Sequence, residues 1–230
     1  MAKRNSKGPP RERFIEETLT LIAEKGGSKD VNLREISRRV GCAHTNAYNY
    51  FNNMDDLLWA AFKRALLLYA EAITAGLEDS LSGYKYFDRL ISNMVDFAVG
   101  NPGLYRFIGS DPLTPESIPE EIVEIITGLK LYYLKVFRTL TKGTVTRAKA
   151  DHAGNTILAY MDGEIFNLIN GRYLPDEQVR GRIIGNIHQL FTLLTSKSND
   201  GIVLRKAAGR SGEIAFPELK VSNLFEGRTS

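Results

Sequence analysis

The stretch that decides the fold is VNLREISRRVGCAHTNAYNYF, residues 31–51. It holds two short segments with the apolar spacing of helices, LREISRRV and HTNAYNYF, separated by a turn of about three residues that begins at Gly41. Asn32 stands three residues before Glu35, a variant of the capping box that opens helices. Two short helices joined in this way form a helix-turn-helix, whose second helix enters the major groove of DNA. An ordinary helical hairpin is the alternative interpretation.

The second segment carries side chains suited to reading DNA. Ile36 and Val40 of the first segment, and Ala47 and Phe51 of the second, are expected to pack against the helix that precedes them. The positions expected to face the groove are His44, Thr45, Asn46, Tyr48, Asn49 and Tyr50. Asn bonds adenine through two hydrogen bonds, Thr offers a hydroxyl and a methyl group, and Tyr hydroxyls reach phosphates.

The chain outside this stretch also has helical spacing up to about residue 198. A helix is expected from Arg11 to Lys25, ended by Gly26 and Gly27, which accept positive φ without a Cβ clash. Further helices are expected at about 55–77, 84–99, 105–108, 117–141, 144–171 and 175–196. Sustained strand alternation is missing before residue 200, and the tail at 199–230 weakly suggests a hairpin. The predicted fold class is therefore all-α.

The charge is unevenly divided along the 230 residues. The net charge is +3, but residues 1–53 carry +4, residues 54–198 carry −2 and residues 199–230 carry +1. A basic N-terminal quarter is expected where one end of a protein faces a polyanion. The cations that could form a basic arm on DNA, or alternatively a tail without structured contacts, are Lys3, Arg4, Lys7, Arg11 and Arg13.

Other classes of function find little support in the residues. The single cysteine, Cys42, excludes a disulfide framework and reads as a small buried hydrophobe rather than a redox sensor. His152 and His188 lack metal-ligand spacing, and Asp162 and Glu164 point roughly opposite ways on a helix. No run of ~18 uncharged apolar residues could span a bilayer. The sequence therefore predicts a cytoplasmic protein that is not an enzyme, with no metal, no cofactor and no membrane segment.

The segment VNLREISRRVGCAHTNAYNYFNNMDDLL, residues 31–58, resembles the DNA-binding region of the TetR family of transcriptional regulators. That region has an aliphatic residue and Gly before the recognition helix, Tyr-x-Tyr/His-Phe at its end, and an acidic residue with Leu-Leu beginning the next helix. The matching residues are Ile36, Gly41, Tyr48, Tyr50, Phe51, Asp55, Leu57 and Leu58. The resemblance covers about residues 11–65, and beyond it only NPGLYRF and YMDGEIF are similar in layout.

The resemblance implies DNA contacts for Asn32 and Arg34 of the second helix, in addition to the six residues of the recognition helix. Two positions depart from the family pattern. Ala43 stands where the family usually has Ser or Thr, so the recognition helix lacks its N-cap, a deficit of roughly 1 kcal/mol. Met54 stands where most members have Lys, which puts a phosphate contact at the start of the fourth helix in doubt.

The resemblance also implies an N-terminal three-helix DNA-binding domain at 1–53 and a larger helical bundle at 54–198 for ligand binding and dimerisation, with a tail of unknown role at 199–230. Aromatic residues at helical spacing belong to a core more often than to a pocket. The candidate ligand-binding residues in this bundle are Phe62, Tyr69, Met94, Phe97, Phe107, Tyr133, Phe137 and Tyr160.

The function implied by the resemblance is a ligand-responsive transcriptional repressor that binds a palindromic double-stranded operator as a homodimer and is released by a small-molecule inducer. Similar proteins pair through their last two long helices, here 144–171 and 175–196. The stripe expected at that interface, unless it packs within one chain, is Ile183, Ile187, Leu190 and Leu194. The alternative function is an α-helical small-molecule-binding protein or enzyme whose helix-turn-helix is vestigial.

Overall fold

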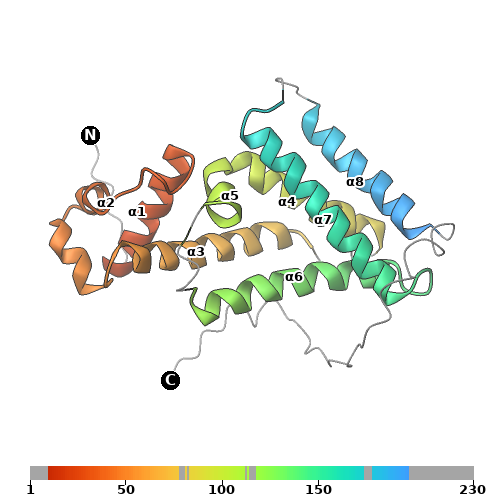
Figure 1. Ribbon diagram of the computed structural model, residues 1–230, viewed down its shortest axis with the longest axis horizontal. Helices are drawn as coiled ribbons and strands as arrows, with labels where there is room; N and C mark the ends of the chain where they lie inside the picture. The colour runs from red at the N-terminus through yellow and green to blue at the C-terminus, as the bar shows by residue number, and fades with distance from the viewer. Residues whose placement is uncertain are drawn as a thin grey trace. The chain divides into compact units, whose positions relative to one another are not determined.

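A computed structural model describes residues 10–77, 81, 83–111, 113, 118–173 and 178–196 (Figure 1). These residues form helices and turns without a strand, which confirms the all-α prediction. The helices are α1 (Pro10–Lys25), α2 (Leu33–Val40), the 3₁₀ helix η1 (His44–Asn49), α3 (Met54–Thr74), α4 (Tyr84–Gly100), α5 (Pro102–Gly109), α6 (Glu120–Leu140), α7 (Arg147–Ile169) and α8 (Val179–Thr195). The predicted cap at Ser117, the hairpin in the tail, and Lys3, Arg4 and Lys7 lie outside the described residues.

The chain divides into two compact units. Unit 1 comprises residues 1–75 and 93–123, and unit 2 comprises residues 76–92 and 124–230. Helices α4 and α6 each contribute residues to both units. The division therefore places α5 and parts of α4 and α6 in the same unit as the helix-turn-helix. The predicted domain boundary at residue 53 stays a prediction.

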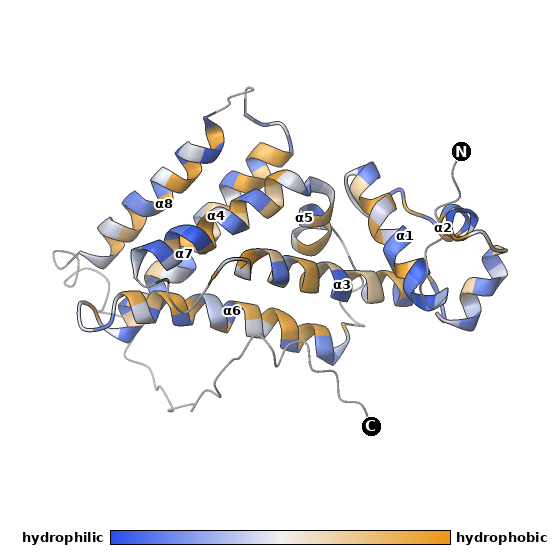
Figure 2. Cartoon of the chain, turned by 180° about the vertical axis from the view of Figure 1, so that it is seen from behind, coloured by the Kyte–Doolittle hydropathy of each residue, from blue (hydrophilic) through white to orange (hydrophobic). Residues whose placement is uncertain are grey.

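Unit 1 is built around α1. This helix packs against α2, α3 and α5, and α3 also packs against α5. Figure 2 shows the apolar residues that run along α3. The expected packing of the helix-turn-helix is confirmed, because Ile36, Val40, Ala47 and Phe51 are all buried. The fully buried side chains they join include Phe14, Leu21, Ile22 and Leu57.

Several predicted helix ends are wrong, and local backbone geometry explains them. α3 ends at Thr74 rather than near residue 77, because Ala75 leaves helical geometry and Gly76 has a φ of +67°. α7 begins at Arg147 rather than Thr144, since Gly143 has a φ of +81° and residues 141–145 form a hydrogen-bonded turn. The side chain of Thr146 caps α7 by accepting from the amide of Lys149. The expected start of the last helix at Pro175 lies outside the described residues, and α8 is seen from Val179.

Unit 2 contains α7 and α8, which lie side by side (Figure 1). Ile157, Met161 and Ile165 of α7 are completely buried, and so are Ile183 and Ile187 of α8. Ile183 and Ile187 therefore pack within their own chain, and their predicted place in a dimer stripe is wrong. The reason is that α8 must bury one apolar face to pack on its own unit at all.

The end of α8 is held by a buried lysine of α7. Lys149 is only 2% exposed, and its Nζ donates a hydrogen bond of 2.6 Å to the carbonyl of Ser196. A positive charge there also complements the negative end of the helix dipole of α8.

A glycine of α5 lies close to the backbone of α1. A Cβ atom added to Gly103 would lie 2.6 Å from the carbonyl oxygen of Ile22 and 3.0 Å from the Cα of Ala23. Both contacts are with the backbone of α1, which cannot turn aside as a flexible side chain can. Gly103 therefore allows α5 to pack directly on α1.

We predict that Gly103→Ala destabilises the protein by about 2 kcal/mol, because the clash outweighs the gain of ~1 kcal/mol in helix propensity. Chemical denaturation followed by circular dichroism measures the change. The matched control is Gly100→Ala at the end of α4, where an added Cβ meets nothing within 4 Å. The control is expected to be neutral or slightly stabilising, and equal stabilities for the two variants would contradict the close approach of α5.

Candidate nucleic-acid interface

The helix-turn-helix begins with the cap predicted from the sequence. Asn32 has extended backbone, and its Oδ1 accepts a hydrogen bond of 3.0 Å from the amide of Glu35. The same side chain was expected to contact DNA, and with its oxygen occupied its Nδ2 is left to donate to a phosphate. The DNA role of Asn32 stays a prediction.

The turn after α2 depends on Gly41. This residue has a φ of +82°, and its amide donates to the carbonyls of Ser37 at 3.0 Å and Arg38 at 3.2 Å. The amide of Cys42 also donates to Ser37 at 3.0 Å, so the end of α2 is closed by a Schellman-type arrangement. Cys42 is half-buried, not fully buried as expected.

The recognition segment forms a 3₁₀ helix, η1, instead of an α-helix. Ala43 provides no side-chain cap, as its sequence position predicted, and the amide of Asn46 donates to the carbonyl of Ala43 at 3.0 Å. Runs of this i to i+3 pattern longer than three or four residues are uncommon, so the six residues of η1 make a long 3₁₀ segment. At its end the carbonyl of Ala47 accepts from the amide of Tyr50 at 3.0 Å and, in the wider i to i+4 pattern, from the amide of Phe51 at 3.0 Å.

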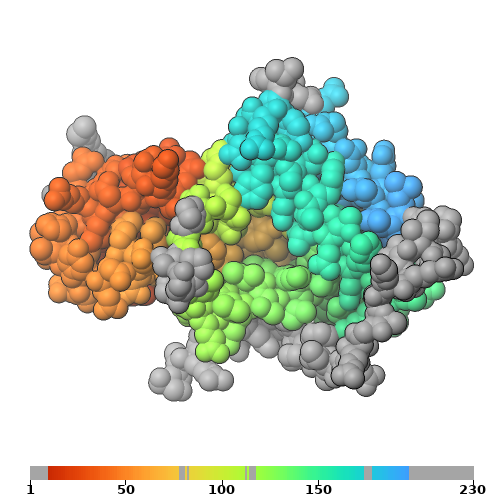
Figure 3. All heavy atoms as spheres, in the orientation of Figure 1, coloured from red at the N-terminus to blue at the C-terminus, as the bar shows by residue number. Residues whose placement is uncertain are grey.

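The six predicted groove-facing side chains are all exposed. Within η1, Ala47 alone is buried, at 1% exposure, and it marks the side of the segment that packs on the protein. In Figure 3 the atoms of this region, coloured orange, lie open on the face shown. The exposed residues are His44, Thr45, Asn46, Tyr48, Asn49 and Tyr50. Their contact with DNA stays a prediction.

Aromatic packing anchors the end of the recognition segment. Phe51 is 4% exposed, and its ring meets that of Phe14 edge to face at a centroid distance of 6.2 Å. The guanidinium of Arg11 lies over the ring of Phe51, 5.2 Å from its centroid. Tyr50 also approaches Phe14 at 6.2 Å while remaining exposed. The contacts of Tyr50 and Phe51 with Phe14 therefore hold the end of the recognition segment against α1.

Two of the predicted arm residues, Arg11 and Arg13, lie in α1 and contact the helix-turn-helix, and a DNA contact by the arm stays a prediction. Arg13 donates a hydrogen bond to the carbonyl of Val40, the last residue of α2. Arg11 stacks on Phe51, as described above. Both side chains therefore contact residues of the helix-turn-helix from the first turn of α1.

Ion pairs between α1 and α2 occupy part of the positive charge. Arg39 bonds both carboxylate oxygens of Glu24, at 2.9 and 2.6 Å, and Lys25 bonds Glu35 at 2.5 Å. The hydrogen bond from Arg39 lowers the pKa of Glu24, and that from Lys25 lowers the pKa of Glu35. Both pairs are complete at neutral pH and weaken as the pH falls and the carboxylates become protonated.

Arg34 and Arg38 are the exposed cations of α2. The side chain of Arg38 is 78% exposed, and its approach to Glu35 is loose at 3.9 Å. Arg34 is exposed as well, on the turn of the helix that follows Asn32. Two exposed guanidinium groups next to an uncharged polar surface are suited to phosphate contacts beside base contacts.

Helix α3 starts directly after the recognition segment. Asn53 caps it by accepting from the amide of Asp56 at 2.8 Å, and Asp56 accepts in turn from the amide of Asn52 at 3.0 Å. Met54, at the position where the family pattern has Lys, is the first residue of α3 and is half-buried. The start of α3 is thus fixed by polar caps, without a cation at its first position.

The eight candidate ligand-binding residues are divided between the two units. In unit 1, Phe62 contacts Phe107 at 5.5 Å, and Tyr69 contacts Phe97 at 5.2 Å, both edge to face. Met94 is buried in the same unit, while Tyr133, Phe137 and Tyr160 belong to unit 2. Six of the eight are buried and pack on other apolar residues, whereas Tyr69 and Tyr160 are half-buried. Their role in a ligand site stays a prediction.

A polar pair that the sequence did not single out lies in unit 2. The hydroxyl groups of Tyr86 on α4 and Tyr132 on α6 share a short hydrogen bond. Burial, together with this hydrogen bond, raises the pKa of Tyr132 well above its usual value. Local sequence patterns give no indication of this pair, because its two members lie 46 residues apart in the chain.

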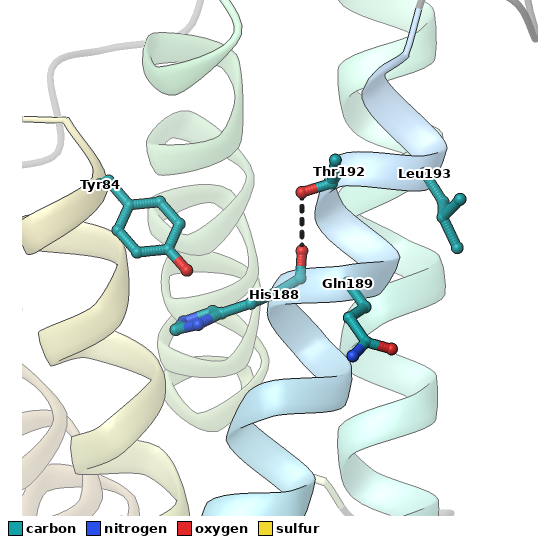
Figure 4. A pocket seen from close by; sticks show the side chains of 5 residues that line it. All are labelled: Tyr84, His188, Gln189, Thr192 and Leu193. Atoms are coloured by element: carbon teal, nitrogen blue, oxygen red, sulfur yellow. Dashed lines mark hydrogen bonds between the residues drawn. The ribbon is translucent and has the colours of Figure 1, made fainter.

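A hollow of about 420 Å³ opens on unit 2, between the start of α4 and α8 (Figure 4). The ring of Tyr84 faces that of His188 at 4.8 Å, and Nε2 of His188 lies 3.2 Å from a carboxylate oxygen of Asp88. Leu193 of α8 is 60% exposed. The lining residues are Tyr84, His188, Gln189, Thr192 and Leu193.

In the described part of the chain, no three His, Cys, Asp or Glu side chains come together as a metal site. None of the helices seen in the structure combines the length and apolar character needed to cross a membrane.

Comparison with known proteins identifies the fold. The chain matches no profile of a known sequence family. The nucleoid occlusion factor SlmA of Haemophilus ducreyi is 19% identical over 166 residues, which span 70% of this chain and 82% of SlmA.

Solved structures of transcriptional regulators have a fold similar to that of this chain. A TetR-family transcriptional regulator from Streptomyces coelicolor superposes with a TM-score of 0.64 at 16% identity, over 80% of this chain and 81% of that one. FadR from Bacillus subtilis, solved in complex with stearoyl-CoA, superposes with a TM-score of 0.57 at 17% identity, over 80% of this chain and 97% of that one. The predicted resemblance is confirmed at the level of the fold. The chain has the fold of the TetR family of transcriptional regulators.

Proposed function

We propose that this protein is a DNA-binding transcriptional regulator that reads a palindromic operator as a homodimer and is released by a small-molecule effector. The observation that carries the proposal is η1, which exposes six polar side chains and buries Ala47. Asn, Thr and Tyr can contact base edges and phosphates, and the exposed Arg34 and Arg38 can contact phosphates. The shared fold supports the same conclusion.

The experiment that tests this proposal is selection of bound DNA from a pool of random duplexes, with full-length protein at physiological salt. A palindromic consensus that two recognition segments can read, with half-sites ~34–36 Å apart, supports the proposal. If no sequence is enriched at any salt concentration, the vestigial helix-turn-helix of the alternative function is correct instead.

We predict different effects for a base-reading and a phosphate-contacting residue. Asn46→Ala should weaken binding to the selected duplex by about 1–3 kcal/mol and relax the base preference at one position. Arg38→Ala should weaken binding to all duplexes alike and lower the slope of log affinity against log salt by about one.

Fluorescence anisotropy over a salt titration measures both effects. The matched control is Lys142→Ala, which removes an exposed positive charge between α6 and α7. If Asn46→Ala weakens all sequences equally, the η1 surface does not read bases.

The homodimer is proposed to form through the outer face of α8, which differs from the stripe expected from the sequence. Gly181 and Gly185 are spaced one turn apart, and an added Cβ at either would meet nothing within 4 Å. Leu193 is exposed and follows two turns later on α8. This open face could receive a second copy, whereas Ile183 and Ile187 are already buried.

We predict that Leu193→Asp converts the dimer to a monomer, because an unpaired carboxylate in an apolar interface is costly to desolvate. Analytical ultracentrifugation measures the change. The control is Val123→Asp on α6, at a position that is similarly exposed, at 49% against 60%. Loss of the dimer in the control but not in Leu193→Asp would move the interface away from α8.

The effector is proposed to bind among the aromatic residues of the helical bundle, and long-chain acyl-CoA thioesters are the first compounds to test, since FadR of Bacillus subtilis was solved with stearoyl-CoA. A true effector raises the melting temperature of the free protein and releases the selected duplex. A compound that stabilises the protein without releasing DNA would contradict its role as an inducer, because a ligand shifts an equilibrium only by its differential affinity for the two states.

A second candidate is DNA binding that does not control transcription. The observation that favours it is the name of the curated relative, a nucleoid occlusion factor. A reporter gene placed behind the selected operator separates the two, since only a transcriptional regulator changes expression of that gene.

A further inference from the structure

The end of α5 and the residues that follow it contact the turn between α1 and α2. Arg106 Nη1 donates a hydrogen bond of 2.9 Å to the carbonyl of Gly26, and Asp111 Oδ2 accepts one of 2.5 Å from the amide of Ser28. Both contacts are partly buried and join positions 80 and 83 residues apart. A guanidinium group and a carboxylate thus grip one short turn through its backbone.

The turn has the sequence needed to admit these groups. Gly26 has a φ of +75°, and an added Cβ there would lie 3.2 Å from Arg106 Nη1. Gly27 has no positive φ, so its backbone does not require glycine. A Cβ on Gly27 would lie 3.2 and 3.4 Å from the two carboxylate oxygens of Asp111. The absence of a side chain at Gly27 is therefore explained by the room that the carboxylate takes.

The gripped turn leads directly into the helix-turn-helix. The carbonyl of Ser28 accepts a hydrogen bond of 3.0 Å from the amide of Val31, and Asn32 then caps α2. α2 in turn packs against η1. The 26–28 turn is therefore joined to η1 through Val31, the Asn32 cap and α2.

We propose that Arg106 and Asp111 form a clamp, here named the α5 clamp, that positions the 26–28 turn and couples α5 to DNA binding by η1. The inference rests on the proposed DNA-binding function. Arg106 and Asp111 are positioning residues, since they hold the backbone of the turn. Any event that moves α5 must break these two bonds or move the turn with it.

Hydrogen exchange with mass spectrometry tests the clamp without an identified effector, because coupling between two sites is reciprocal. Full-length protein is compared with and without a saturating amount of the selected duplex. In the native protein, DNA should slow amide exchange in 44–51 and also in 103–109. In Asp111→Ala, slowing at 44–51 should remain while slowing at 103–109 is lost, and DNA affinity should fall on the order of tenfold.

Two further variants control for folding and for charge. Asp111→Asn keeps an oxygen that accepts from Ser28 and should retain the coupling. Gly27→Ala pushes the carboxylate of Asp111 away without altering Asp111 and should lose the coupling, so it also replaces Asp111→Ala if that variant does not fold.

Each outcome gives a decision. If DNA slows exchange at 44–51 but leaves 103–109 unchanged in the native protein, the clamp is overturned while the proposed function stands. Equal slowing at 103–109 in the native protein, Asp111→Ala and Gly27→Ala also overturns it. If no duplex slows exchange at 44–51, the proposed function fails, and the clamp fails with it.

Discussion

Burial of α1 is the constraint on which unit 1 depends. Phe14, Leu21 and Ile22 lose nearly all contact with water, and each neighbour of α1 covers part of that surface. At about 25 cal/mol per Å² of apolar area, a few such side chains exceed the contribution of any one exposed ion pair, which is typically 0–1 kcal/mol. The helix-turn-helix therefore has no core separate from the helix on which it packs, and α5 shares that core through the close approach at Gly103.

The recognition segment illustrates the consequence. η1 is six residues long, lacks a side-chain cap and has 3₁₀ geometry, so it would not persist as an isolated helix. Ala47 and Phe51 hold it in place from one side. Because Ala47 and Phe51 make these packing contacts, the exposed positions of η1 can carry polar side chains without loss of packing.

Spacing within the chain predicted the local features well. The three-residue interval from Asn32 to Glu35 predicted a cap, and the cap is present. Gly41 predicted the turn that ends α2, and Ala43 predicted a recognition segment without a side-chain cap. These features need only neighbouring residues, because capping and turn geometry are decided within one helical turn.

Features that join distant residues could not be predicted in this way. Arg13, one of the cations predicted for a basic arm, donates to the carbonyl of Val40, because α1 and α2 pack against each other. Ile183 and Ile187 read as a stripe, and an apolar stripe has the same spacing whether its partner is α7 or a second chain. The tyrosine pair at 86 and 132 and the grip of Asp111 on Ser28 leave no mark on local sequence patterns.

The sequence by itself determined that the chain is helical, where most helices start, and which six residues lie on the open side of the recognition segment. Periodicity and capping depend on residues that are close together in the chain, so the amino-acid sequence alone is enough to predict them. Only the tertiary structure decided which charges are free, which side of α8 remains open, and why Gly27 and Gly103 carry no side chain. Those outcomes depend on the atoms that distant segments place beside each residue, and packing in three dimensions alone determines them.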